Sequence, residues 1–365
     1  MKIITKTLLI ISALALTFLA PAQQKPVRIG VAGLTHDHIH GLLGRKAKGD
    51  IVIVGIAEPN QALVEKYANL YHIDKKLFFP TLDEMLRKTK PEAVMAYNDI
   101  FGHLEVVEKC APRGIHVMVE KPLAVSTEHA EKMAVLAKKY QIQLLTNYET
   151  TWYGSNAVAY KMADEENAIG QIRKIEFHTG HQGPVEIGCS KEFLAWLTDP
   201  VLNGAGALND FGCYGANIAT WLMKGKTPVS VTAVTHTNKP QVYPKVDDEA
   251  TIVLQYPEAQ VVIQASWNWP YNRKDMELYG QSGYVFCKNA TDMAILKTGE
   301  KQPQDYTAPA LPDSRNDAFS YLAGVVRGSI NPAPSDLSAL PNNITVVKIL
   351  EAAKISAKTG KTVFW

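Results

Sequence analysis

The stretch Val117-Met-Val-Glu-Lys-Pro122 is the most informative part of this sequence. Its apolar residues predict a buried strand that ends on a carboxylate and an ammonium group, and the proline stops the strand there. In an open α/β sheet, ligands bind outside the carboxyl ends of the strands. The pattern therefore places Glu120 and Lys121 at a ligand-binding edge.

Short apolar runs alternate with helical patterns on both sides of this stretch. Strands are predicted over residues 27–33, 51–57, 93–96, 115–119 and 142–145, and helices over 38–48, 61–71, 104–111 and 127–140. Strands that alternate with helices form a parallel, doubly wound sheet. We therefore predict an N-terminal dinucleotide-binding Rossmann domain over residues 26–148.

The loop after the first strand departs from the usual dinucleotide-binding pattern. That pattern is G-x-G-x-x-G, which allows a tight turn and close approach of the pyrophosphate. This chain has Gly33-Leu-Thr-His-Asp-His38, which keeps only the first glycine. Glu58 follows the second strand, where an acidic residue accepts the ribose hydroxyls, and its charge favours NAD over NADP.

The carboxyl ends of the strands carry the residues that we expect to bind this cofactor. Most of them are polar, and they come from five separate parts of the first 150 residues. They are Gly33, Thr35, His38, Glu58, Asn98, His103, Glu120, Lys121 and Asn147.

Three closely spaced histidines allow a different interpretation. His36, His38 and His40 follow the first strand, as H-x-H does in metal-dependent hydrolases built on (β/α)₈ barrels. Such a site needs further His and Asp ligands at later strand ends, and few are present there. We therefore predict no metal site, and expect these histidines to line the cofactor loop or to cap the next helix.

The second half of the chain has longer alternating strands, over residues 172–179, 229–236, 250–255, 261–267 and 274–279. This pattern predicts a second α/β domain, residues 149–365, with a large, mostly antiparallel open sheet. A loop rich in Gly and Ala leads into a helix that carries Asp210, Tyr214 and Asn217. Their i, i+4 and i+7 spacing places them on one helical face.

The combination of these motifs resembles the Gfo/Idh/MocA oxidoreductases, in particular the glucose–fructose oxidoreductase branch. The matching segments are Glu120-Lys-Pro122, His103, the segment from Gly206 to Asn217, Val246-Asp-Asp-Glu-Ala250 and Tyr279-Gly-Gln-Ser-Gly283. The resemblance implies a nicotinamide cofactor and a sugar or polyol substrate. It also implies association through the C-terminal sheet, as a homodimer or homotetramer.

The resemblance assigns roles to three catalytic residues. Lys121 would bind both the cofactor and the reacting hydroxyl, and Asp210 would orient the substrate. Tyr214 stands where most members have a His acid/base, and we expect the Lys121 ammonium to lower the pKa of its phenol. Asn217, which stands where many members have Asp, is a predicted substrate contact. Trp152 and Tyr153 are two more, because their rings suit the apolar faces of a sugar.

The N-terminus predicts export. Residues 1–22 contain two lysines, a short apolar run and Ala20-Pro-Ala22, the parts of a secretory signal peptide. We therefore expect a periplasmic or secreted protein that does not insert into the membrane once this segment is removed. The net charge of +2 offers no field for binding nucleic acid.

Export also limits the chemistry, because free nicotinamide cofactor is not expected outside the cytoplasmic membrane. We therefore predict a tightly held cofactor that is regenerated in each cycle. One route oxidises one sugar and reduces another. A second is a glycoside hydrolase or lyase that acts through a transient ketone. A non-catalytic exported sugar-binding protein is the remaining alternative, since a fold does not establish a function.

Overall fold

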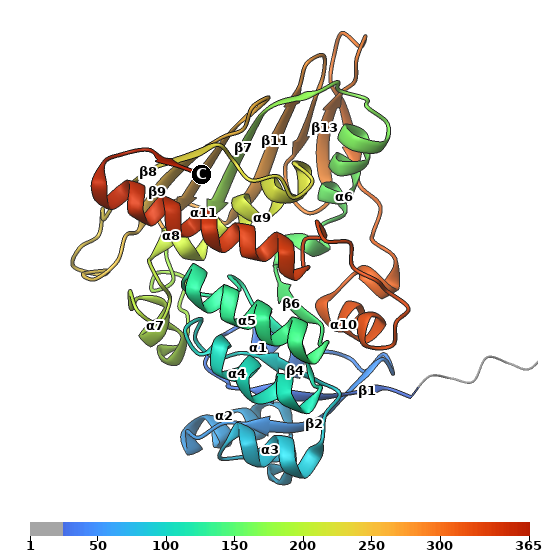
Figure 1. Cartoon of the computed structure of the whole chain (residues 1–365), viewed down its shortest axis with the longest axis vertical. Coiled ribbons are helices and arrows are strands. Elements are labelled where there is room, and N and C mark those ends of the chain that lie inside the picture. The colour runs from blue at the N-terminus through green and yellow to red at the C-terminus, as the bar shows by residue number, and fades with distance from the viewer. Residues whose placement is uncertain (1–24) are drawn as a thin grey trace, which may run out of the picture.

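The computed structural model describes residues 25–365 of the 365-residue chain. The predicted signal peptide lies outside the described residues. Two sheets organise the molecule, the first in the lower half of Figure 1 and the second in the upper half.

The first sheet is parallel and has the strand order β3-β2-β1-β4-β5-β6. Its strands are β1 (Val27–Ala32), β2 (Ile51–Ala57), β3 (Phe78–Phe79), β4 (Ala93–Ala96), β5 (His116–Glu120) and β6 (Leu144–Asn147). The helices between them are α1 (Ile39–Leu43), α2 (Gln61–Tyr71), α3 (Leu82–Thr89), α4 (His103–Cys110) and α5 (Thr127–Tyr140). The predicted Rossmann sheet is confirmed. The strand order reverses between β1 and β4, which is where ligands bind in such sheets.

Local signals explain where several of these helices begin. The side chains of Asn60, Thr81 and Ser126 accept backbone amides in the first turns of α2, α3 and α5. Each satisfies a donor that the helix itself cannot pair. The predicted helix over residues 38–48 is shorter in the structure, because α1 ends at Leu43 and Arg45 then turns to bind Asp50 through its two terminal guanidinium nitrogens.

The second sheet has nine strands in the order β14-β13-β12-β11-β7-β10-β9-β8-β15. Their bounds are β7 (Ile172–Gly180), β8 (Ser230–His236), β9 (Glu249–Gln255), β10 (Gln260–Ser266), β11 (Arg273–Gly280), β12 (Tyr284–Cys287), β13 (Asp292–Leu296), β14 (Gln304–Thr307) and β15 (Val363–Phe364). All neighbouring pairs are antiparallel except β7 with β10. The prediction of a mostly antiparallel sheet is confirmed.

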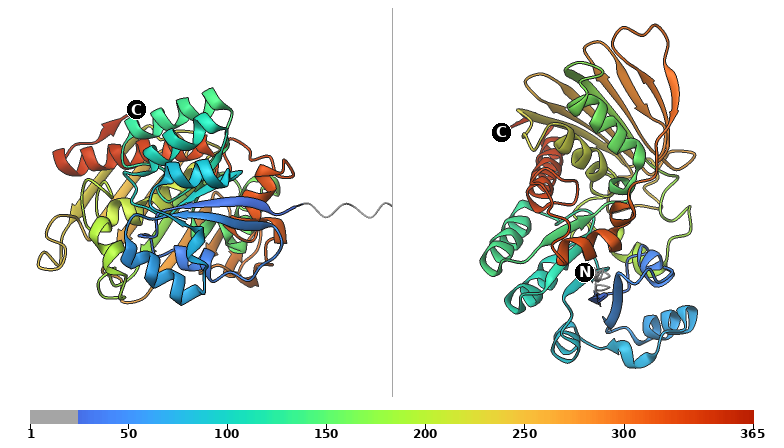
Figure 2. Two further views of the ribbon diagram at one scale, coloured as in Figure 1. Left: turned by 90° about the horizontal axis from the view of Figure 1, so that it is seen from below. Right: turned by 90° about the vertical axis from the view of Figure 1, so that its right-hand side faces the viewer.

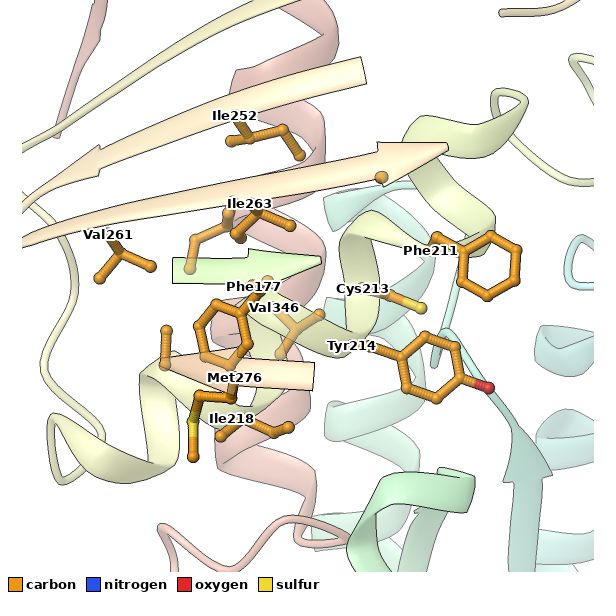
Figure 3. Close-up of a cluster of buried hydrophobic side chains, with 14 of the residues drawn as sticks. Phe177, Phe211, Cys213, Tyr214, Ile218, Ile252, Val261, Ile263, Met276 and Val346 are labelled. Carbon is orange, nitrogen blue, oxygen red and sulfur yellow. The ribbon is translucent and has the colours of Figure 1, made fainter. Parts of the chain in front are cut away.

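Helices cover one face of the second sheet (Figure 2). They include α8 (Ala207–Asp210), α9 (Gly212–Leu222) and α11 (Leu340–Thr359), while α6 (Gly154–Tyr160) and α7 (Lys191–Leu197) lie on the connections around β7. Figure 3 shows the resulting core, in which Phe177, Ile252 and Ile263 of the sheet face Ile218 of α9 and Val346 of α11. The other face of the sheet is half-exposed and polar along β7.

Helix α10 (Ala318–Val326) returns to the first sheet, although it lies within the predicted C-terminal domain. Its N-cap Asp317 accepts a hydrogen bond from Arg45, and Ser320 donates one to Asp50. Tyr321 and Leu322 join the core of the first domain. The predicted boundary at 148/149 therefore marks where the first sheet ends, but the C-terminal segment contributes to both cores. Across residues 25–365, every helix is too short or too polar to cross a bilayer.

Candidate active site

A cavity of about 330 Å³ lies between the two domains, at the carboxyl edge of the first sheet. The N-terminal domain contributes charged and imidazole side chains, and the C-terminal domain contributes a mixture of charged, aromatic and small ones. The lining residues are Asp37, His38, Lys121, Glu149, His181, Gln182, Ile187, Cys189, Phe193, Asp210, Phe211, Tyr214, Asn272 and Lys274. The three residues predicted as catalytic, Lys121, Asp210 and Tyr214, all line this cavity.

Lys121 and Asp210 form a buried ion pair on one wall. The Lys121 Nζ donates to the backbone carbonyl of Asp210 at 2.9 Å and to its carboxylate Oδ1. Burial alone would lower the pKa of Lys121, but the Asp210 carboxylate outweighs burial and holds that pKa above its usual value. Burial likewise acts to raise the pKa of Asp210, and Lys121 brings it below its usual range. Both groups are therefore charged at neutral pH.

The second domain fixes the Asp210 side chain from two sides. Its Oδ2 accepts the indole Nε1–H of the fully buried Trp267 at 2.9 Å. The start of α8 is held by Asp247, whose carboxylate accepts the amides of Gly206 and Leu208. A Cβ on Gly206 would lie 1.8 Å from the Asp247 carbonyl oxygen, so only glycine allows this approach. The sequence motifs around residues 206 and 247 therefore act together to place Asp210.

Tyr214 lies beside Lys121 but is not activated as predicted. The Lys121 Nζ is 5.2 Å from the Tyr214 ring centroid, and Figure 3 shows the phenol pointing away from the apolar core. However, burial raises the pKa of Tyr214 well above 10, and the nearby Glu149 raises it further. The expected lowering by Lys121 is wrong, because Asp210 already neutralises that ammonium. Tyr214 therefore stays a protonated phenol at neutral pH, able to donate a hydrogen bond, and it is a weaker acid than a free tyrosine.

The cavity lining also includes polar groups that were not predicted from the sequence. Lys274 Nζ is 2.8 Å from the Glu149 carboxylate and 5.7 Å from the Tyr214 ring centroid. His181 follows the end of β7, and its Nδ1 accepts the amide of Gly183 at 3.0 Å. Its Nε2 therefore carries the ring proton, and burial lowers its pKa to about 4, so the imidazole is neutral. The sequence did offer a signal for these residues, since Glu149 and His181 come shortly after strands and Lys274 lies at the start of one.

Glu120, next to Lys121, lies in a chain of hydrogen bonds that leads away from the cavity. Its carboxylate pairs with His38 Nδ1 at 2.8 Å and accepts from the Asn147 amide at 2.8 Å. Asn147 in turn accepts the Trp152 indole N–H at 3.0 Å. Three predicted cofactor residues, His38, Glu120 and Asn147, are thus brought together, while Trp152 supports them from behind.

The turn after β1 has the positive φ and the close backbone approach that require a glycine at position 33. Gly33 has φ +82°, and a Cβ there would lie 2.9 Å from the Asn98 Cβ. His103 is fully buried behind Lys121, where its Nδ1–H donates to the Leu123 carbonyl and burial lowers its pKa to about 4. His36 Nε2, Asn98 Oδ1 and His103 Nε2 are buried and make no hydrogen bond within the described residues. Such orphaned atoms suit a polar ligand at this edge.

The phosphate end of the same loop does not fit a dinucleotide as it stands. The amides of Gly33, Leu34, Thr35 and His36 lie in the turn at which a Rossmann domain holds the pyrophosphate, and they donate to Ala57, Glu58 and Tyr97. Glu58 has the predicted position but not the predicted free carboxylate. It is 4% exposed, and its two oxygens accept the amides of Leu34 and Asn60 at 2.9 and 2.8 Å. Burial raises its pKa. In this conformation the four amides are therefore not free to bind a phosphate.

His36, His38 and Glu120 bring possible metal-ligand atoms within 4.8 Å of one another. The hydrogen bonds argue against such a use. His36 Nδ1 accepts the His38 amide at 3.2 Å, so Nε2 carries the ring proton and neither nitrogen has a free lone pair. A metal ion would have to break this bond, and the prediction of no metal site stands as a prediction.

Three predicted substrate contacts lie elsewhere. Asn217 is fully buried, and its amide donates to the Leu337 carbonyl and to Asn343 at 2.8 and 3.2 Å. Asp210 ends α8 and Tyr214 lies in the first turn of α9, and both line the cavity, whereas Asn217 lies about one turn further along α9 and is covered. Trp152 lines a separate cavity and Tyr153 donates its hydroxyl to Glu149 at 2.5 Å. Both support residues of the site rather than line the cavity.

Comparisons with known proteins agree with this architecture. Residues 27–148 match the oxidoreductase family with an NAD-binding Rossmann fold, and residues 159–286 match the GFO/IDH/MocA C-terminal domain. Trans-1,2-dihydrobenzene-1,2-diol dehydrogenase of Xenopus tropicalis is 22% identical over 83% of this chain and 89% of its own length. Inositol 2-dehydrogenase of Rhizobium meliloti (strain 1021) is 22% identical over 80% of this chain and 87% of its own.

Solved structures give the same fold. An aldose-aldose oxidoreductase from Caulobacter crescentus, complexed with glycerol, has a TM-score of 0.77 and 22% identity, covering 93% of this chain and 100% of its own. An inositol dehydrogenase homolog from Azotobacter vinelandii, complexed with NAD+, has a TM-score of 0.78 and 17% identity, covering 93% and 98%. At these identities the likeness shows the fold alone. With both domains matched, the chain belongs to the Gfo/Idh/MocA family of NAD(P)-dependent oxidoreductases.

Proposed function

We propose that this protein oxidises or reduces a carbon–oxygen centre of a neutral sugar or glycoside in the cavity between its domains, with NAD as cofactor. The buried Lys121–Asp210 pair carries this proposal, because it places a fixed ammonium group on the cavity wall at the carboxyl edge of β5. Bound cofactor would supply a hydride acceptor or donor. The glycerol complex and the names of the inositol and diol dehydrogenases support a polyhydroxylated substrate.

The charges of the cavity favour a neutral substrate over a sugar acid. The carboxylates of Asp37, Glu149 and Asp210 outnumber the two ammonium groups, Lys121 and Lys274, and each ammonium is already paired. A substrate carboxylate would therefore find no free cation there. The carboxylate of Glu58, with Glu192 near it, also favours NAD over NADP, because both charges oppose an added phosphate.

The side chains divide the work at the reacting oxygen. Lys121 uses two of its protons on Asp210 and has a third for the substrate oxygen. Tyr214 is protonated, so it suits protonation of a carbonyl oxygen in the reducing direction. In the oxidising direction, only the minor phenolate form of Tyr214 can accept the proton of the substrate hydroxyl. A sugar–sugar oxidoreductase of the glucose–fructose type uses both directions, and we propose that this protein does so with a tightly held cofactor.

A redox-neutral glycoside hydrolase or lyase is the second candidate. Elimination after transient oxidation needs a further proton-transfer group, and the neutral imidazole of His181 lines the same cavity. We also propose that the protein acts after export and associates through its second sheet.

Purified full-length protein, incubated with NAD and a panel of sugars and glycosides, tests these proposals by product analysis. A ketosugar, or a lactone paired with an alditol, supports the oxidoreductase. Free sugar with no net redox change supports the glycosidase. No turnover, together with no nucleotide released on denaturation and no binding of added NAD or NADP, would leave the non-catalytic alternative.

A further inference from the structure

Helix α7 of the C-terminal domain packs directly on the loop that should bind the cofactor phosphates. The Trp196 Nε1–H donates to the Thr35 carbonyl at 3.2 Å. The amide of Ser190, the N-cap of α7, donates to the Asp37 carboxylate at 2.9 Å. These contacts join residues more than 150 positions apart, so they depend on the relative placement of the two domains.

Aromatic contacts complete this interface. The His36 ring lies 4.8 Å from the Phe193 ring and 5.3 Å from the Trp196 ring, measured between centroids. An ion pair between Lys66 of α2 and Glu192 of α7, at 3.6 Å, joins the same two domains beside the loop. His36 is only 1% exposed as a result. The loop is therefore covered from outside by α7 as well as tied from inside by Glu58.

This arrangement conflicts with free entry of a dinucleotide. A Rossmann domain binds the pyrophosphate at the turn after β1 and the ribose at the end of β2. Here the amides of that turn are paired, Glu58 is buried, and α7 with its N-cap contacts the turn at Thr35, His36 and Asp37. The protein nevertheless belongs to a family with an NAD-binding domain, so binding requires these contacts to open.

We propose that α7 is a gate on the cofactor site, and that NAD enters and leaves only when α7 separates from the Gly33–His38 loop. The inference rests on the proposed function and extends it to the exchange of the cofactor. Trp196 and Asp37 are positioning residues for the loop, since each acts through it. If α7 closes again over bound NAD, the gate slows dissociation as well as association, which suits a protein that keeps its cofactor through many turnovers.

Stopped-flow measurement of NADH binding and release tests the gate. Trp196→Phe keeps a buried aromatic ring but removes the hydrogen bond to Thr35 together with part of the indole, and Asp37→Ala removes the bond from Ser190. Trp221→Phe is the matched control, because Trp221 packs on Tyr160, away from the loop. We expect both loop variants to raise the association and dissociation rate constants about fivefold, the value of one neutral hydrogen bond. The control should match wild type.

The possible results separate the gate from the function on which it rests. Binding by Trp196→Phe where wild type binds too slowly to detect would support the gate. Faster dissociation with unchanged association would mean that α7 merely stabilises the bound loop, and would overturn it. Equal rates in wild type and both loop variants would also overturn it, while leaving the proposed function intact. If no variant binds NADH or NADPH, both the gate and the proposed function fail.

Discussion

Replacing Asp210 by Asn tests the buried ion pair most directly. The Lys121 and Asp210 side chains are each 5% exposed, so water cannot take the place of the lost carboxylate. Removing one partner of a buried pair costs about 3–5 kcal/mol, because the remaining charge stays desolvated. We expect Asp210→Asn to lower the free energy of unfolding by about this amount at neutral pH.

The loss should depend on pH in a defined direction. Without Asp210, burial alone acts on Lys121 and lowers its pKa in the folded state. The unfolded chain then binds more protons than the folded one between that lowered pKa and the usual lysine value of about 10.4. Stability of the variant therefore rises with pH across this window. The deficit relative to wild type should be largest below the lowered pKa and should shrink towards alkaline pH.

Urea unfolding followed by circular dichroism, at about pH 7 and about pH 9, measures both effects. Lys121→Met and the double variant complete a thermodynamic cycle. The double variant should lose much less than the sum of the single losses, since it leaves no unpaired buried charge. Glu84→Gln, which breaks the exposed pair with Lys88, is the control and should change little. A near-wild-type Asp210→Asn at pH 7, or strictly additive losses in the double variant, would refute the reasoning.

Three further predictions concern single side chains of the site. Because burial raises the pKa of Tyr214, the rate of sugar oxidation should climb from about pH 7 to about pH 10 without a plateau. In steady-state assays, Tyr214→Phe should flatten this pH profile and lower kcat about 100-fold. A plateau of the wild-type rate near neutral pH would contradict this prediction. Lys274→Met should raise KM about tenfold with little change in kcat, because Lys274 and Glu149 line the cavity but Lys274 lacks the contact with Asp210 that Lys121 makes. An unchanged KM would exclude Lys274 from substrate binding. Asn217→Ala should lower the free energy of unfolding by about 1–3 kcal/mol, because it leaves the Leu337 carbonyl with one donor fewer. The same variant should leave KM unchanged. A raised KM at wild-type stability would show instead that Asn217 contacts the substrate.

Hydrophobic periodicity was sufficient to predict both sheets and most of their strands. Strand β2 and helices α2 and α5 have the predicted bounds, because their apolar spacing, caps and stop signals lie within a few residues of one another. Such signals are local properties of the chain. The return of α10 to the first sheet was not predictable in this way, since it depends on the distant pairing of Asp50 with Ser320 and of Arg45 with Asp317.

The predicted site was right where residues follow strand ends and wrong where helical spacing was extended too far. Lys121, Glu120 and Asn147 lie together because adjacent parallel strands end at one edge. Asn217 was misplaced because it lies about one turn further along α9 than Tyr214, where Leu337 and Asn343 cover it, and i, i+4, i+7 spacing cannot reveal such long-range packing.

The sequence by itself determined the Rossmann sheet, the second sheet and the position of Lys121 at a strand end, because each follows from short-range pattern. The tertiary structure decided the electrostatic state of that lysine, which depends on a carboxylate 89 residues away in another domain. It also decided that Tyr214 remains a phenol and that α7 closes over the Gly33–His38 loop. Charge, burial and access at Glu120-Lys121-Pro122 arise from groups that only folding brings together.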